Sequence, residues 1–236
     1  MLHYSRKDLK QAAKNDLSGR WGLAIGAALL AMIVPSVILS IPSSILSTMS
    51  SMMMELGDVE QGALYSALGT VFSTIFTILV LGPLSFGYYA FTLRFSRREE
   101  VTATLPYRVF TSGVFGRYAL AFFMMNLFIT LWSLLFLIPG IVKSYSYYLT
   151  AFLLNDHPEM GWKEAINESK RMMNGHKMEL FMLHLSFLGW IILSIFTLGI
   201  LLIYVVPYMQ QAEANFYRAL REEPIGVYPQ APDMQA

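Results

Sequence analysis

Three side chains that could hold a metal ion or pass a proton lie in the last third of the chain. His176 and Glu179 are three positions apart in a stretch that predicts a helix, so both can face one ion. His184 follows further along the same helix. The alternative is structural, with His176 at lipid headgroups or loop carbonyls and His184 hydrogen-bonded to a neighbouring helix. We favour the structural alternative and predict no metal site and no cofactor, because the spacing is not that of a metalloprotease helix.

Lys143 is a single cation inside an apolar stretch, three residues after Pro139-Gly140 in "KSYSYY". A cation within a membrane is costly, so its presence suggests a functional site. Near a helix end, however, the long lysine stem can carry its ammonium group to the headgroups. Both interpretations stay open, and the snorkelling lysine is favoured. Tyr147 is expected to anchor at an interface or pack between helices, with ligand contact as the alternative.

Four polar residues make the last apolar helix polar on more than one side: Gln210, Gln211, Glu213 and Asn215. Polar groups in lipid must find partners. Either the helix leaves the membrane here, or a polar cavity opens between helical hairpins, lined by Gln210, Glu213 and Tyr217. The candidate polar cavity comprises Lys143, Tyr147, His184, Gln210, Glu213 and Tyr217.

Catalytic motifs are missing from the sequence. It contains no phosphate-binding loop, no nucleophile elbow and no cysteine, so we predict that the protein is not an enzyme. The formal net charge is only +1, which gives no reason to expect a nucleic-acid partner.

Composition places the chain in a membrane. Hydrophobic residues make up 55% and charged residues 14%, whereas soluble domains carry about 25% charged residues. The first apolar run is longer than a signal-peptide core, so we expect it to be retained. We predict an all-α, polytopic transmembrane helical bundle over residues 21–222, between an amphipathic cytoplasmic segment at 1–20 and a cytoplasmic tail at 223–236.

Six spans built from helical hairpins are predicted, near 22–48, 63–95, 118–138, 141–155, 179–197 and 200–220. Pro35 and Pro42 should bend the first span, and Gly82-Pro83 should kink the second. Turns are expected at Pro139-Gly140 and at Thr197-Leu198-Gly199. Two amphipathic interfacial helices are expected at 5–18, where Ser5 and Asp8 suggest a capping box, and at 156–175, capped by Asp156 and ended by Gly175. A solvated tail is the alternative for the first of them.

The basic residues decide between turning and crossing once at the last break. If the chain turns at both glycine-containing breaks, every Lys and Arg except Lys143 falls on one side, and cytoplasmic loops are enriched in these residues. Both termini then lie inside. A single crossing at 194–217 would leave Arg218 and Arg221 outside. We favour the turn.

The C-terminal third also resembles a bacterial integral-membrane family. The similarity lies in "EAINESKRMMNGHKMELFMLHLSFLGW" and "TLGILLIYVVPYMQQAEANFY", and "IPGIVKSYSYY" and "GPLSFGYYAF" add to it. The chain is similar to the domain-of-unknown-function family nine-seven-five, common in Gram-positive bacteria. The motif residues are Ser169, Lys170, Gly175, His176, Lys177, Ser186, Gly189, Trp190, Gly199, Pro207 and Tyr208. Leu201 departs from the family, where a glycine is expected. The resemblance implies a multi-pass protein of the bacterial membrane and implies no activity.

Two functions are consistent with the sequence. The first is a non-enzymatic accessory or scaffold protein of the bacterial cytoplasmic membrane, with both termini cytoplasmic. Its partners would be the lipid bilayer and a membrane protein or a second copy of the chain. The second is a small transporter or lipid-handling protein with a polar intramembrane cavity.

Overall fold

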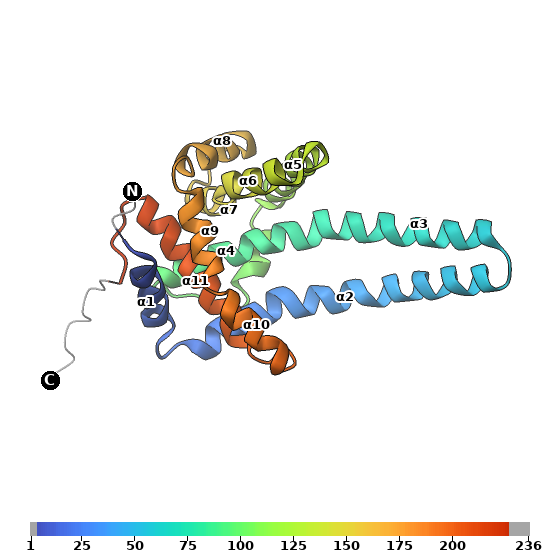
Figure 1. The fold of residues 1–236 in the computed structure, drawn as a ribbon, viewed down its shortest axis with the longest axis horizontal. Coiled ribbons are helices and arrows are strands. Elements are labelled where there is room, and N and C mark those ends of the chain that lie inside the picture. Colours follow the sequence, from blue (N-terminus) through green and yellow to red (C-terminus); the bar gives the residue numbers. More distant parts are fainter. Residues whose placement is uncertain (1–3, 227–236) are drawn as a thin grey trace.

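The computed structural model describes residues 4–226, and every regular element in that range is a helix (Figure 1). In chain order they are α1 (Arg6–Leu17), α2 (Trp21–Glu55), α3 (Val59–Phe76), the π-helical η1 (Thr77–Leu81), α4 (Gly82–Ser96), the 3-10 helix η2 (Leu105–Phe110), α5 (Phe115–Leu135), α6 (Leu137–Tyr147), α7 (Thr150–Asp156), α8 (Trp162–Met172), α9 (Lys177–Leu185), α10 (Leu188–Phe196) and α11 (Leu202–Leu220). The all-α prediction is confirmed. Most of the predicted tail, 227–236, lies outside the described residues.

Four helical stretches among the described residues are long and apolar enough to cross a membrane: Trp21–Glu55, Val59–Ser96, Phe115–Leu135 and Lys177–Phe196. They match the predicted spans at 22–48, 63–95, 118–138 and 179–197. The two other predicted spans are not among them. The span at 141–155 is divided between α6 and α7, and the span at 200–220 becomes α11, whose polar residues lower its hydropathy.

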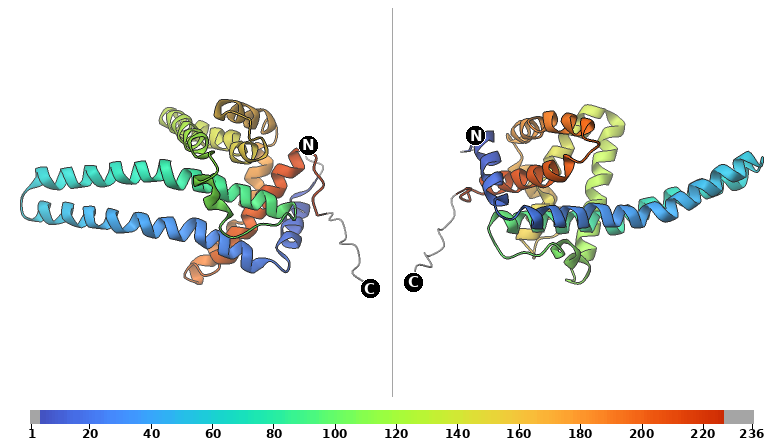
Figure 2. Two further views of the ribbon diagram at one scale, coloured as in Figure 1. Left: turned by 180° about the vertical axis from the view of Figure 1, so that it is seen from behind. Right: turned by 90° about the horizontal axis from the view of Figure 1, so that it is seen from below.

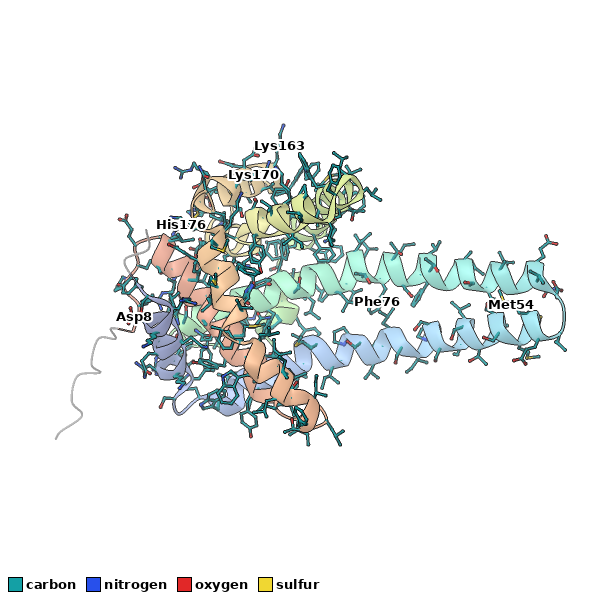
Figure 3. The ribbon with its side chains drawn as sticks, in the orientation of Figure 1. Asp8, Met54, Phe76, Lys163, Lys170 and His176 are labelled. Carbon is teal, nitrogen blue, oxygen red and sulfur yellow. The ribbon has the colours of Figure 1, made fainter. Side chains whose placement is uncertain are left out.

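A long hairpin of α2 and α3 projects well beyond the other helices (Figures 1 and 2). The 35 residues of α2 extend for about 52 Å, against about 30 Å of hydrocarbon in a bilayer. The helix continues through Pro35 and Pro42, and the outer part of the hairpin curves as predicted (Figure 2, right). Met54 lies near the tip and Phe76 lies where α3 approaches the other helices (Figure 3).

The second candidate span changes its hydrogen-bond register just before Gly82-Pro83. In η1 the N–H of Gly82 donates to the carbonyl of Thr77, one residue further back than in an α-helix. Pro83 has no N–H of its own, so this wider turn removes the clash that a proline causes inside an α-helix. A Cβ atom at Gly82 would lie 2.5 Å from the Phe122 ring, so the glycine also lets α5 approach.

The two shorter hairpins turn at different kinds of break. Between α5 and α6 the chain reverses at Phe136, whose backbone is extended (φ −158°, ψ 144°). The predicted turn at Pro139-Gly140 is therefore displaced, because Pro139 fits the first turn of α6, where a missing N–H costs nothing. Between α10 and α11 the turn lies where it was predicted, at Leu198 (φ 51°) and Gly199 (φ 84°), and the chain doubles back (Figure 1).

Helix α1 is folded against the other helices and is not a solvated tail. The predicted capping box is present, with the Ser5 hydroxyl bonded to the Asp8 N–H and the Asp8 carboxylate bonded to the Ser5 N–H. Leu9, Ala13 and Leu17 are buried, and α1 packs mainly on α11. Its apolar face is therefore covered by protein.

The second predicted amphipathic helix is shorter than 156–175. Helix α8 begins at Trp162 and ends at Met172, and Gly175 follows in a left-handed conformation (φ 85°). Lys163 and Lys170 both belong to this helix (Figure 3), and the Lys170 ammonium group lies over the Tyr147 ring. Asp156 does not cap this helix. It ends α7 and binds Arg97.

Candidate functional site

The polar residues of α11 face four neighbouring helices. Gln211 and Asn215, four residues apart, both donate to the Asp16 Oδ2 of α1, at 3.0 and 2.7 Å. Glu213 faces α9, and Gln210 faces α2 and α4. The polar character of this helix is thus explained by contacts within the protein.

Asp16 is fully buried, and its Oδ1 has no hydrogen-bond partner. Burial raises the pKa of this carboxyl group above its usual range, while the hydrogen bonds from Asn215 and Gln211 offset part of that rise. Because the folded pKa is raised, the stability that Asp16 contributes is largest when it is protonated and falls as pH rises through the folded pKa. The attachment of α1 is therefore sensitive to changes at this residue.

Replacing Asp16 by alanine should release α1. The change leaves the buried amide groups of Gln211 and Asn215 without an acceptor, which costs about 1–3 kcal/mol. We expect faster trypsin cleavage after Lys10 and Lys14 in the purified protein, and no change with the exposed control Lys7→Ala. Equal cleavage of Asp16→Ala and wild type would contradict the docking of α1 through this residue.

His184 and Glu213, both predicted to line a cavity, are in direct contact. The His184 Nε2 lies 2.9 Å from the Glu213 Oε1, and the His184 Nδ1 lies 3.3 Å from the Tyr145 hydroxyl. A proton on Nε2 lets His184 donate to Glu213 while Nδ1 accepts from Tyr145. The Glu213 side chain is 2% exposed, and its Oε2 has no hydrogen-bond partner. Glu213 is therefore a buried carboxylate in which one oxygen is bonded to His184 and the other can still accept a hydrogen bond.

A cavity of about 270 Å³ lies between α2, α4 and α11. Its polar lining residues are Ser36, Ser85, Tyr88, Tyr89 and Gln210. The Tyr88 hydroxyl and the Gln210 Oε1 are buried without hydrogen-bond partners. Glu213 follows the lining residue Gln210 by three positions in α11, less than one helical turn away. The polar cavity is thus formed by α2, α4 and α11.

Three other residues predicted for the cavity lie elsewhere. The Lys143 Nζ sits over the Trp132 ring at 4.5 Å, within the α5–α6 hairpin. Tyr147 is buried between the Phe128 ring and the Lys170 ammonium group. Tyr217 stacks on Phe152. None of the three has a described contact with Glu213.

His176 and Glu179 face each other, as their spacing predicts, with 2.7 Å between Nδ1 and Oε2. His184 belongs to the separate pair with Glu213. The described residues contain no group of three side chains that could hold a metal ion.

Several residues of the family-like motif bind elements together. The Ser169 hydroxyl of α8 donates to the Ser146 carbonyl and accepts from the Leu149 N–H, across the α6–α7 break. Lys10 of α1 donates to the hydroxyl and carbonyl of Ser186, both at 3.1 Å, at the break between α9 and α10.

The other motif residues shape helix ends and faces. Gly175 and Gly199 adopt left-handed conformations at helix ends. Tyr208 packs edge-on against Phe187, one residue after Pro207 inside α11. Lys177 begins α9, and Gly189 and Trp190 lie in α10, with Trp190 half-exposed.

An ionic network that sequence reasoning missed joins the ends of α4, α7 and α11. Arg97 donates to both carboxylate oxygens of Asp156, at 2.6 and 2.9 Å, and to Glu223 at 2.7 and 3.1 Å. The Tyr217 hydroxyl also donates to Asp156, at 2.9 Å. Burial alone would raise the pKa of Asp156, but the bonds and charge of Arg97 bring it below its usual value. No sequence signal links these residues, because they lie far apart in the chain.

Four apolar helical stretches long enough to span a bilayer define an α-helical membrane protein. The chain belongs to the family described as "Protein of unknown function (DUF975)", whose model matches residues 1–143 and 135–224. The comparisons with curated proteins and with solved structures gave no match.

Proposed function

We propose that this protein is a non-enzymatic accessory or scaffold protein of the bacterial cytoplasmic membrane that binds a partner along the α2–α3 hairpin. The observation that carries the proposal is the projection of this hairpin from the other helices (Figure 1). Beyond its own η1 extension, α3 packs chiefly on α2. A long pair of helices with so little internal support leaves most of its surface available to other helices.

The outer surface of α3 carries one apolar stripe. Leu64, Leu68, Val71 and Ile75 follow at intervals of four, three and four residues, which places them on one helix face, and each is about half-exposed. In lipid such a stripe can meet acyl chains or another helix. A partner would pack there by van der Waals contact.

The proposed orientation has both termini in the cytoplasm and the α2–α3 turn outside. Glu55, Asp58 and Glu60 give that turn an acidic character, whereas the basic residues lie near the opposite ends of the helices. The two shorter hairpins enter the membrane from the cytoplasmic side and return to it.

Cysteine labelling of intact cells should confirm this orientation. The chain has no cysteine, so single substitutions need no altered background. A membrane-impermeant maleimide should label Glu60→Cys in intact cells and should label Glu222→Cys only after permeabilisation. Labelling of Glu222→Cys in intact cells would refute the proposed orientation.

Photocrosslinking tests the scaffold function itself. A photoreactive residue at Leu68 or Val71 should give one discrete crosslinked protein in the native membrane. The same residue at Leu198, an apolar and 93% exposed position on the α10–α11 turn, should give none. A product that contains only this chain would identify a second copy as the partner. Indiscriminate products from all three positions, or no product, would reject a specific partner on the hairpin.

The buried pair of Glu213 and His184 favours a second candidate, a small transporter or lipid-handling protein. A carboxylate with an unused oxygen near a cavity of about 270 Å³ is a means of binding a substrate or a proton inside a membrane. Glu213→Gln keeps the shape of the side chain and removes its charge. If this candidate is correct, the variant should fold normally and lose movement of a substrate or lipid across reconstituted vesicles.

A further inference from the structure

A second cavity of about 270 Å³ lies where α4 ends and α5 begins. It is separate from the cavity near Glu213 and is enclosed by α4, η2, the start of α5 and the end of α7. The polar residues that line it are Arg94, Arg108, Ser112, Arg117, Tyr118 and Asn155. Three of these six are arginines, which makes the cavity strongly positive.

Two of the arginines are available to a ligand. Arg108 is exposed, and its side chain has no described hydrogen-bond or ion-pair partner in residues 4–226. Arg94 has only a long ion pair, 3.9 Å to Glu99, in which both side chains are about half-exposed. Such an exposed pair contributes little and gives way readily to another anion.

The third arginine is fixed in place. The terminal nitrogens of Arg117 donate to the carbonyls of Leu154, at 3.3 Å, and of Pro158. Its Nε is buried and has no hydrogen-bond partner. A buried N–H on a cation is costly to leave unpaired, so the site lacks an acceptor.

The start of α5 borders the same cavity. Val114, which lines the cavity, is the N-cap of α5, and no side chain caps the helix. Tyr118 is the first residue of α5 whose N–H bonds within the helix, so the N–H groups of residues 115–117 remain unused there. The positive end of the helix dipole therefore lies at the edge of the cavity, which favours an anion.

Nearby carboxylates offset little of the charge of the cavity, since Glu99 makes only the long ion pair with Arg94. Asp156, which follows the lining residue Asn155, is already bound by Arg97 and Tyr217. Asn155 accepts from the Tyr118 hydroxyl at 2.6 Å and donates to the Phe86 carbonyl at 2.9 Å, so both lining residues are held in position.

We propose that this cavity binds the phosphate group of a phosphate ester, either an anionic lipid headgroup or a soluble phosphate. Planar guanidinium groups and backbone N–H groups are the donors that phosphate oxygens accept. The cavity lies between the ends of two candidate membrane spans, which is where the orientation proposed above places lipid headgroups. The proposal does not rest on a partner for the α2–α3 hairpin.

Lipid titration with native mass spectrometry tests the proposal on the purified full chain in detergent. The lipid probes are phosphatidylglycerol and phosphatidylcholine, and inorganic phosphate, monitored by thermal shift, is the soluble probe. Arg94→Gln and Arg108→Gln should each weaken binding of whichever probe occupies the cavity, phosphatidylglycerol or inorganic phosphate, by about tenfold. Each substitution removes a charge-assisted contact. The control Lys7→Gln removes an exposed cation from α1 and should bind like wild type.

The outcomes distinguish the two sources. Selective binding of phosphatidylglycerol that both arginine variants weaken assigns the cavity to a lipid headgroup. A thermal shift with inorganic phosphate that both variants weaken, without selective lipid binding, assigns the cavity to a soluble phosphate ester. Binding that neither variant changes, or no binding of either probe by a folded wild type, would overturn the proposal. Thermal unfolding of each variant without ligand shows whether it is folded.

Discussion

Replacing Arg97 by alanine is expected to lower the free energy of unfolding by about 2 kcal/mol, because it leaves Asp156 and Glu223 without their main cation. The side chain of Arg97 is 25% exposed, so the expected loss is smaller than for a fully buried pair. Thermal unfolding of the purified protein in detergent measures the effect. The ends of α4, α7 and α11 should separate first.

Arg171→Ala is the matched control for this prediction. Arg171 also forms a short ion pair, 2.5 Å to Glu168, but its side chain is 77% exposed. Its removal should leave the unfolding temperature close to that of the wild type, since exposed ion pairs contribute little to stability. Equal losses in Arg97→Ala and Arg171→Ala would show that the network does not join the three helices.

The Arg97 network also predicts a dependence on pH. The pKa of Asp156 lies below its ordinary value of 3.8, so the stability it contributes is present above that value. This contribution is lost as pH falls through the lower pKa of the folded state. The difference in unfolding temperature between wild type and Arg97→Ala should therefore persist at mildly acidic pH and shrink only below about pH 4. A difference that disappears near neutral pH would contradict the assignment.

Gly87→Ala is expected to be strongly destabilising, at about 1–3 kcal/mol or more. An added Cβ would lie 3.0 Å from both the Cα and the carbonyl carbon of Pro106, and closer still to the carbonyl oxygen. These are backbone atoms, so they cannot turn aside as a flexible side chain can. The 3-10 helix η2 would have to move, and with it the hydrogen bond of 2.6 Å from the Tyr107 hydroxyl to the Leu30 carbonyl.

Gly189→Ala provides the comparison. Gly189 lies within α10, and an added Cβ would meet nothing within 4 Å. Alanine is the better helix former, so this variant should unfold at or slightly above the wild-type temperature. If Gly87→Ala and Gly189→Ala unfold at the same temperature, then α4 and η2 are not packed as described.

Local sequence patterns predicted much of the fold. Apolar length indicated the four candidate spans, Ser5 and Asp8 indicated the start of α1, and Gly199 indicated the last turn. The turn at Pro139-Gly140 was displaced because proline is compatible with both a helix break and the first turn of a new helix. The two additional predicted spans were not confirmed, for different reasons. At 141–155 a short apolar run does not distinguish one crossing helix from two shorter ones, and at 200–220 the polar residues lower the hydropathy of α11.

The candidate site was less predictable than the helices. The polar residues of α11 were visible in the sequence, but their division among Asp16, His184 and a cavity depends on which helices surround α11. The pairing of Arg97 with Asp156 and Glu223 was not predicted for the same reason. Contacts between distant segments follow from the fold and not from sequence spacing.

The inner seam of the α2–α3 hairpin has a mechanical consequence. Serine and threonine residues line a groove of about 510 Å³ there, and several of their hydroxyls bond to carbonyls of their own helix. A hydrogen bond across the hairpin, from the Ser50 hydroxyl to the Gly62 carbonyl at 2.8 Å, lies near its tip. The Ser50–Gly62 hydrogen bond joins the two helices at the tip, and the other hydroxyl bonds stay within one helix, so the hairpin can tilt as a unit without breaking them. A hairpin longer than the hydrocarbon layer can in this way adapt to bilayers of different thickness.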